Sequence, residues 1–290
     1  DCGVVSTKEP FQKLFNQGMI LAHSYQSNAN KYFHPEEVEQ REDKVWVVKQ
    51  TGEPVSMQIE KMSKSRLNVV NPDQVIEQYG ADAMRGYEMF MGPLDQDKPW
   101  ADKGIQGVYR FLSRVWRLFV QDGQIKYPED ATFPEAPLEK LLHKTIKKVG
   151  EDIESMRFNT GIAALMELNN ACYKHKQLPR ALLEPFTLLL APYFPHLAEE
   201  LWHKLGHTGT LAHEPWSEYN PAMVVDEHIT VVVQVNGKLK AKLQVPNHLE
   251  PSELKSHARQ ADEIEPLLEG KTIRKVIVVP NRLVNFVVST

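Results

Sequence analysis

The stretch KMSKSRLNVVNPDQVIEQYGADAMR, residues 61–85, places a short cationic loop directly before two helices. Asn71 is suited to cap the first helix, because its side chain can accept a hydrogen bond from a free backbone N–H, and Pro72 fits the first helical position. Gly80 is suited to end that helix. A second helix is predicted over about 82–91, before a Gly-Pro pair stops it.

The loop itself, Lys61-Met62-Ser63-Lys64-Ser65, carries two ammonium groups and two hydroxyls. When ATP is attacked at its α-phosphate, negative charge builds on the departing pyrophosphate, and a lysine on a mobile loop can approach that charge in the transition state. Lysine suits this role because its ammonium is a point charge on a long stem. Taken alone, the five residues also fit an ordinary solvated basic loop, which is the commoner case.

Upstream of the loop the chain changes character. The apolar run at 18–22 fits either a buried strand or a helix end, because periodicity cannot separate the two at this length. Residues 24–58 are mostly polar and charged, with an apolar run at 45–48 and a turn signal at 52–54. This pattern indicates a small β-rich insertion with turns.

Downstream, from residue 104 to about 207, apolar residues recur at spacings of three and four. Helices of this kind bury one stripe each and pack on one another, so the segment is predicted to be a helical bundle. Asn159 is expected to cap one helix, and a last helix is expected over 188–202 with a break near Pro192 and Pro195. Residues 213–225 are predicted to be a linker.

The last part of the chain, residues 228–290, has the period of β-strands. Apolar residues alternate over 229–235, and Asn236-Gly237 is a strong hairpin signal. In the next strand Lys238, Lys240 and Lys242 are expected on one face, with Leu239, Ala241 and Leu243 on the other. A helix over 251–268 and strands over 273–279 and 283–288 complete a small α+β domain.

Composition restricts the possible functions. The 290 residues suit two or three domains, and 42% hydrophobic with 25% charged residues is typical of a folded soluble protein. Two cysteines, Cys2 and Cys172, exclude a disulfide framework and favour a reducing, cytosolic setting. No apolar run approaches the roughly 20 residues that cross a bilayer. His203, His207 and His213 lack a further closely spaced ligand, so no metal site is predicted.

Charge is distributed unevenly. The net charge of the chain is −4, but residues 228–290 hold nine Lys or Arg against six Asp or Glu. A basic terminal part on an acidic body is compatible with a polyanionic partner.

The loop 61–65 is identical to the KMSKS motif of class I aminoacyl-tRNA synthetases, and the residues after it, through 85, resemble the Leu, Ile, Val and Met enzymes of that class. Further runs resemble bacterial leucyl-tRNA synthetases specifically: EPF at 9–11, QGMI at 17–20, YEMFMGPL at 87–94, GVYRFL at 107–112, FNT at 158–160, APYFPHLAEELW at 191–202, VQVNGK at 233–238 and IRKVIVVP at 273–280. This ordered set covers nearly the whole chain and is far more specific than the motif alone.

The resemblance implies a multidomain fold. Residues 1–103 would be the end of an α/β Rossmann catalytic domain, with the loop and a leucine-enzyme-specific insertion at 24–58. Residues 104–222 would be an α-helical bundle of the anticodon-binding type, and 228–290 a small α+β C-terminal domain that binds tRNA.

The resemblance also implies an ATP-dependent ligase that activates leucine and transfers it to tRNA-Leu, cytoplasmic and monomeric when complete. Lys64 would be the principal catalytic lysine and Lys61 its support. Met62, Ser63 and Ser65 would complete the ATP site, with Mg²⁺ bound through ATP and not by the protein.

Two groups of basic residues are candidates for contacts with tRNA. Arg110, Arg114 and Arg117 lie at i, i+4 and i+7 on one helix face, a stripe suited to phosphates but also common on solvated helices. In the tail the candidates are Lys238, Lys240, Lys242, Arg274, Lys275 and Arg282, which could instead protect a sheet edge. The resemblance favours tRNA for both groups, through backbone and shape. Because the family does not read the anticodon, no anticodon-reading residue is assigned.

The chain departs from the family's pattern in two ways. Arg66-Leu67-Asn68 stands where many relatives have Lys-Gly-Asn, so the loop's exit is expected to be stiffer. The family's first ATP motif, editing insertion and leucine pocket do not occur here, so leucine and ATP would also need the N-terminal half. The start at Asp1 favours an incomplete polypeptide, while a non-catalytic tRNA-binding module and one subunit of a split synthetase remain as alternatives.

We therefore expect the purified 290-residue chain to form no leucyl-adenylate by itself. The measurement is leucine-dependent exchange of pyrophosphate into ATP. Exchange above the background of a protein-free sample would contradict this expectation.

Overall fold

The computed structural model describes residues 2–9, 11–225, 228–247 and 249–289. The chain forms two compact units, which adjoin in sequence between residues 223 and 224. Within the described ranges, none of the helices combines the length and apolar character that crossing a bilayer requires.

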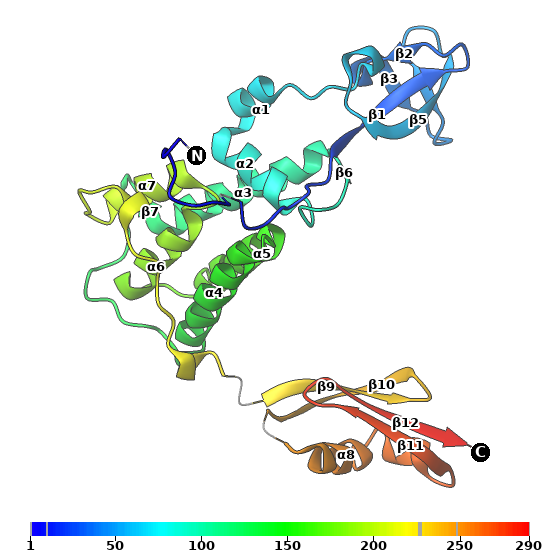
Figure 1. The fold of residues 1–290 in the computed structure, drawn as a ribbon, viewed down its shortest axis with the longest axis vertical. Coiled ribbons are helices and arrows are strands. Elements are labelled where there is room, and N and C mark those ends of the chain that lie inside the picture. The colour runs from blue at the N-terminus through cyan, green and yellow to red at the C-terminus, as the bar shows by residue number, and fades with distance from the viewer. Residues whose placement is uncertain (1, 10, 226–227, 248, 290) are drawn as a thin grey trace. The chain divides into compact units, whose positions relative to one another are not determined.

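The first unit begins with an antiparallel sheet, in the strand order β2-β1-β5-β4-β3 (Figure 1). Its strands are β1 (Ile20–Ser27), β2 (Tyr32–Phe33), β3 (Val38–Gln40), β4 (Trp46–Val48) and β5 (Pro54–Lys61), and β6 (Lys98–Pro99) pairs with β1 in parallel. A 3-10 turn, Pro35–Glu37, precedes β3. The β-rich character of 24–58 is confirmed. The ambiguous run at 18–22 enters a strand, and β1 crosses the expected boundary between residues 23 and 24.

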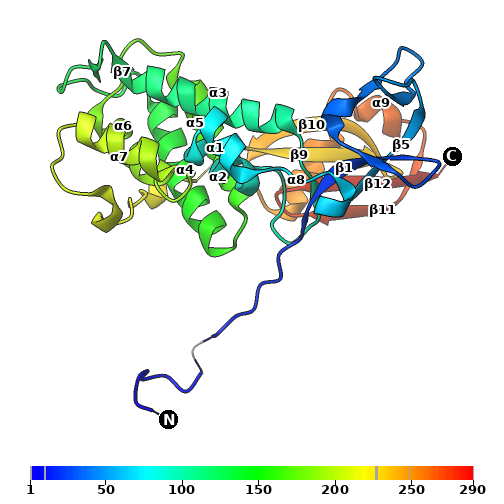
Figure 2. The same ribbon diagram turned by 90° about the horizontal axis from the view of Figure 1, so that it is seen from above.

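The chain that leads into this sheet forms no helix or strand over the described residues 2–9 and 11–19 (Figure 2). Its last part is fixed at Gly18, whose N–H donates to the Leu94 carbonyl at 2.9 Å. A Cβ at Gly18 would lie 2.1 Å from the Gln96 carbonyl carbon, so only glycine allows this approach.

Two short helices follow the cationic loop, as predicted. They are α1 (Pro72–Tyr79) and α2 (Ala81–Phe90). Asn71 caps α1, accepting a hydrogen bond from the Asp73 N–H at 3.0 Å, and Gly80 ends it with a φ of 87°. Both termini follow from local chemistry that the sequence shows directly.

The predicted bundle is present. It comprises α3 (Asp102–Phe119), α4 (Ala136–Glu154), α5 (Phe158–Cys172), α6 (Arg180–Leu190) and α7 (Pro195–Lys204), with a hairpin of β7 (Val120–Gln121) and β8 (Gln124–Ile125) and 3-10 turns at Leu211–His213 and Pro221–Met223. Figure 1 shows α4 and α5 side by side. Asn159 is not a cap, because Arg157 holds that position. The break expected near Pro192 and Pro195 is present, because α6 ends at Leu190 and α7 starts at Pro195; the residues before the break belong to a helix that starts earlier than expected, at Arg180.

Helix α2 is built into this bundle. Asp82 accepts hydrogen bonds at 2.8 Å from the backbone N–H of Leu197 and from His196 Nδ1, so it caps α7 from another helix. Gly86 faces the Phe194 ring, where a Cβ would lie 2.1 Å from Cε1. One hydrophobic core extends from Ala83 through α2 to Leu211, so the boundary expected at 103–104 coincides with no break in packing.

The second unit is a four-stranded sheet in the order β10-β9-β12-β11. Its elements are β9 (His228–Val235), β10 (Lys238–Pro246), α8 (Pro251–Arg259), α9 (Glu265–Leu268), β11 (Thr272–Val279) and β12 (Leu283–Ser289). The Asn236-Gly237 turn has positive φ at both residues, 50° and 77°, as this hairpin requires. The helix predicted over 251–268 is interrupted and forms α8 and α9.

A buried carboxylate joins α4 to the start of α5. Asp152 is 1% exposed and accepts hydrogen bonds from Lys148 Nζ at 2.9 Å, Arg157 Nε at 3.0 Å and Thr160 Oγ1 at 2.7 Å. Burial raises the pKa of Asp152, but the bonds from Lys148, Thr160 and Arg157 outweigh burial and hold this pKa below its usual value.

Replacing this carboxylate should destabilise the first unit most at neutral pH. Because the pKa of Asp152 is lower in the folded state, its stabilisation is present above the unfolded pKa, about 4, and is lost as pH falls through the folded value. We expect Asp152→Asn to lower the free energy of unfolding by about 1–3 kcal/mol at pH 7 and by less near pH 3. Urea unfolding measures both values. The matched control is Asp130→Asn, which removes an exposed carboxylate. If Asp152→Asn lowered the free energy of unfolding equally at both pH values, the lowered pKa assigned to Asp152 would be contradicted.

Candidate functional site

The cationic loop 61–65 begins where β5 ends. Lys61 is the last residue of β5, and Lys64 opens a 3-10 turn that runs to Arg66. The side chains of Lys61, Lys64 and Ser65 are exposed, whereas Met62 packs against the main hydrophobic core. The loop is therefore anchored at Met62 and presents both ammonium groups to solvent.

A buried amide closes the loop from behind. Asn68 is 4% exposed; its Oδ1 accepts from the Ser63 N–H at 2.9 Å, and its Nδ2 donates to the Lys61 carbonyl at 3.4 Å. The hydroxyls of Ser63 and Ser65 lie 2.9 Å apart. Sequence reasoning did not assign Asn68 to the site. In the sequence, Asn68 is only an asparagine three residues after the motif. Its role becomes visible when the structure shows the chain folding back on Ser63 and Lys61.

Glu60, the acidic residue that directly precedes the loop, already contacts Arg66 and Ser24. Glu60 Oε1 lies 3.5 Å from Arg66 Nη2, and Glu60 Oε2 accepts a hydrogen bond from Ser24. Arg66 Nη1 also donates to the Lys61 carbonyl at 3.4 Å. In the described part of the chain neither Lys61 nor Lys64 has an ion-pair partner, so their charges are available to an anion.

Leu67, at the loop's exit, has a left-handed backbone with a φ of 55°. This is the position where the resemblance expects glycine. A non-glycine residue in that conformation costs roughly 1–2 kcal/mol. The departure in sequence therefore falls on a residue whose backbone favours glycine.

The three bundle arginines lie along α3 as predicted. The Arg114 guanidinium stacks over the Tyr173 ring, 4.9 Å from its centre, and the Tyr173 hydroxyl donates to the Arg114 carbonyl at 2.7 Å. Arg117 Nε donates to the Ser113 carbonyl at 3.2 Å. Arg110 is exposed.

The tail lysines do not share one face, which corrects the expectation. The register between β9 and β10 shifts between Leu239 and Ala241, so a bulge at Lys240 breaks the alternation. Leu239 is 55% exposed as a result. Lys242 pairs with Val232 and therefore lies on the sheet face without helices. Lys238 pairs with the buried Val235 and therefore lies on the opposite face.

A second shift, between Ile273 and Lys275, puts Arg274 at a bulge in β11. Lys275 pairs with Val287, next to the buried Phe286, so it lies on the same open face as Lys242. These two lysines occupy the two edge strands, β10 and β11. Arg282 precedes β12 in the turn, and its carbonyl accepts from the Val232 N–H.

Charge in the second unit is separated between its layers. Residues 228–246 and 271–289, which hold the strands, carry seven Lys or Arg and no Asp or Glu. Residues 247–270, which hold α8 and α9, carry six Asp or Glu and two Lys or Arg. α8 and α9 pack their apolar residues on one sheet face, which leaves the other face open and basic at its edges.

His203 and His207 are held by contacts within the fold. His207 stacks on Trp202 with ring centres 3.6 Å apart, and its Nε2 lies 2.9 Å from Glu184 Oε1. His203 Nδ1 lies 3.1 Å from the His207 carbonyl oxygen. Among the residues that the structure describes, no three His, Cys, Asp or Glu side chains gather as metal ligands.

Comparison with known proteins identifies the family. A family model described as tRNA synthetases class I (I, L, M and V) matches residues 50–100, and one described as the anticodon-binding domain of tRNA ligase matches residues 137–256. Leucine–tRNA ligase 1 of Rhizobium johnstonii is 50% identical over 99% of this chain, which spans 34% of that protein.

A solved structure agrees with this result. It is the ternary complex of the Agrobacterium radiobacter K84 agnB2 LeuRS with tRNA and LeuAMS, with 34% sequence identity and a TM-score of 0.62. The match covers 80% of this chain and 32% of that one. The chain thus spans about a third of the length of the relatives it matches. It belongs to the leucyl-tRNA synthetase family of class I aminoacyl-tRNA synthetases and carries that family's anticodon-binding-type domain.

Proposed function

We propose that this chain is the part of a leucyl-tRNA synthetase that supplies the ATP-phosphate loop and the tRNA-binding surfaces. The whole enzyme would activate leucine with ATP and transfer it to tRNA-Leu. Residues 1–103 would then be the end of the Rossmann catalytic domain, with the small sheet as its insertion. The enzyme would be cytoplasmic and act as a monomer.

The observation that carries the proposal is that the exposed ammonium groups of Lys61 and Lys64 have no ion-pair partner among the described residues. Arg66 and Ser24 engage Glu60, so the acid beside the loop does not neutralise these lysines. Met62 and Asn68 fix the ends of the loop while the lysine stems stay free. A solvated basic loop would need neither the buried amide nor the core anchor.

In the proposed reaction the leucine carboxylate attacks the α-phosphorus of ATP and pyrophosphate leaves. Lys64 would approach the departing phosphates and Lys61 would add charge at the base of the loop, while Ser63 and Ser65 donate hydrogen bonds. The loop itself holds no carboxylate, which is in keeping with Mg²⁺ bound through the ATP phosphates.

Lys64→Ala in the complete enzyme tests the catalytic role. Loss of one group that stabilises transition-state charge should lower leucine-dependent pyrophosphate exchange by about 10²–10³-fold. Binding of tRNA-Leu should remain unchanged, because the side chain acts on ATP.

The control for this substitution is Lys103→Ala, an exposed lysine that has no ion pair in the described chain. It should leave both measurements at the level of the unmodified enzyme. An unchanged exchange rate for Lys64→Ala would refute the role and favour a non-catalytic tRNA-binding module.

For tRNA, the open face of the sheet in the second unit supports binding through the phosphate backbone. Lys242 and Lys275 lie on its two edge strands, and the strands carry no acid. The aromatic residue of this sheet, Phe286, is buried beneath the helices, so the described face offers no ring on which a base could stack. Arg110, Arg114 and Arg117 would form a second phosphate-binding stripe on α3.

The double substitution Lys242→Ala with Lys275→Ala should weaken binding of tRNA-Leu by the 290-residue chain. If each lysine contacts one phosphate, the dependence of log Kd on log salt should become shallower by about 2. The matched control, Lys255→Ala with Arg259→Ala, removes equal charge from α8 and should have little effect. If both double variants lost tRNA binding equally, the effect would come from net charge and not from this face of the sheet.

A further inference from the structure

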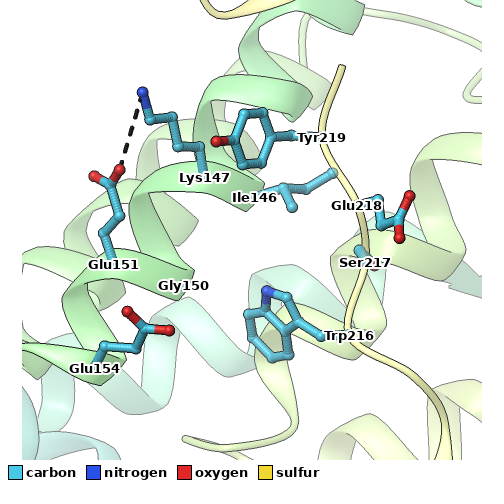
Figure 3. A pocket seen from close by; sticks show the side chains of 9 residues that line it. All are labelled: Ile146, Lys147, Gly150, Glu151, Glu154, Trp216, Ser217, Glu218 and Tyr219. Carbon is cyan, nitrogen blue, oxygen red and sulfur yellow. Dashed lines mark ion pairs between the residues drawn. The ribbon is translucent and has the colours of Figure 1, made fainter. Parts of the chain in front are cut away.

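A pocket of about 460 Å³ lies in the first unit between α4 and the segment 214–220 (Figure 3). Its volume falls in the range of small-molecule sites. The residues that matter for its chemistry are Ile146, Lys147, Gly150, Glu154, Trp216 and Tyr219. None of them belongs to the loop 61–65 or to the proposed phosphate-binding residues.

The segment is held against α4 by specific contacts. The Asn220 N–H donates to His143 Nδ1 at 3.2 Å. Gly150 leaves room for the indole, because a Cβ there would lie 3.3 Å from Trp216 Nε1. Ile146, which is 2% exposed, lies at the base of the pocket. The pocket is therefore formed by packing of the segment on one helix face.

Two aromatic rings remain accessible in this pocket. Trp216 is 41% exposed and Tyr219 is 39% exposed. The protein's own Lys147 ammonium lies 5.8 Å from the Tyr219 ring centre. Aromatic faces attract cations through their quadrupole. The position of Lys147 beside Tyr219 shows this attraction within the pocket itself.

The ionised groups of the pocket have an excess of negative charge. Three carboxylates, Glu151, Glu154 and Glu218, oppose the single ammonium of Lys147. Lys147 pairs with Glu151 at 3.9 Å, and Figure 3 shows Glu218 pointing away from α4. Glu154 has no partner in the described chain, and Figure 3 shows its carboxylate on the opposite side of the pocket from Trp216.

We propose that this pocket binds an organic cation, an ammonium or guanidinium group on an aliphatic stem. The charge pairs with Glu154, and the stem lies against the Trp216 ring and Ile146. The excess of carboxylates repels phosphates, so this site is distinct in chemistry from the surfaces proposed for tRNA. The inference stands whether or not the proposed function does, because it uses none of those residues.

The Trp216 indole N–H is a direct reporter. The chain has five tryptophans, so the ¹H–¹⁵N spectrum should show five indole signals, and Trp216→Phe identifies the one from the pocket. Titration of the 290-residue chain with n-butylguanidinium should shift this signal saturably, with a Kd on the order of millimolar for so small a ligand. The other four indoles, Trp46, Trp100, Trp116 and Trp202, should stay in place.

Two comparisons isolate the charge. n-Butylurea has the same shape without the charge and should bind about five-fold more weakly, as should n-butylguanidinium to Glu154→Gln. The matched control is Glu167→Gln, an exposed glutamate on α5, which should bind like the unmodified chain. Gly150→Val should abolish the response, because its side chain occupies the space beside Trp216.

Two further probes distinguish the source of the cation. Tighter binding of spermidine indicates a free polyamine, and tighter binding of a blocked Gly-Arg-Gly peptide indicates a basic side chain of a partner; either result supports the site. The proposal is overturned by any of three results with folded protein: no saturable shift at Trp216, equal binding of the urea, or tighter binding of guanosine than of n-butylguanidinium.

Discussion

The first unit depends on one contact between helices distant in sequence, in which Asp82 of α2 caps α7. Helix α7 starts at Pro195 without a side-chain cap of its own, and its first N–H groups need acceptors. Asp82 supplies one for Leu197 and also binds His196, and Gly86 lets the Phe194 ring approach α2 closely. A side chain at residue 86 or a lost carboxylate at residue 82 would weaken the packing of α2 on α7.

This contact has a consequence for the cationic loop. The loop leads into α1 and α2, and α2 shares its core with α3, α5 and α7. Asn68 and Met62 then determine where the loop begins and folds back, while Arg66 occupies the neighbouring acid. The backbone of the loop is therefore held in place, while the side chains of Lys61 and Lys64 are exposed. Leu67 adds strain at the exit that glycine would not carry.

Local chemistry was predictable from the sequence, and contacts across the fold were not. Asn71 and Asn236-Gly237 act through their immediate neighbours, so their roles follow from residue type and position. Asp82 and Asn68 gave no such signal, because their partners are set by tertiary folding. The bulge at Lys240 was missed for a related reason, since alternation assumes one partner per residue and a bulge adds one. The motif and its flanking runs indicated the family. The lysines that share a sheet face could be identified only from the register between the strands.

We infer that α2 joins the loop-bearing helices and the bundle into one cooperative unit. Native-state hydrogen exchange at increasing denaturant measures this directly, because it gives the opening free energy of each helix. We expect the buried amides of α2 and α5 to open together, with the same free energy and the same dependence on denaturant. An opening of α2 at clearly lower free energy, while α5 stays protected, would contradict it.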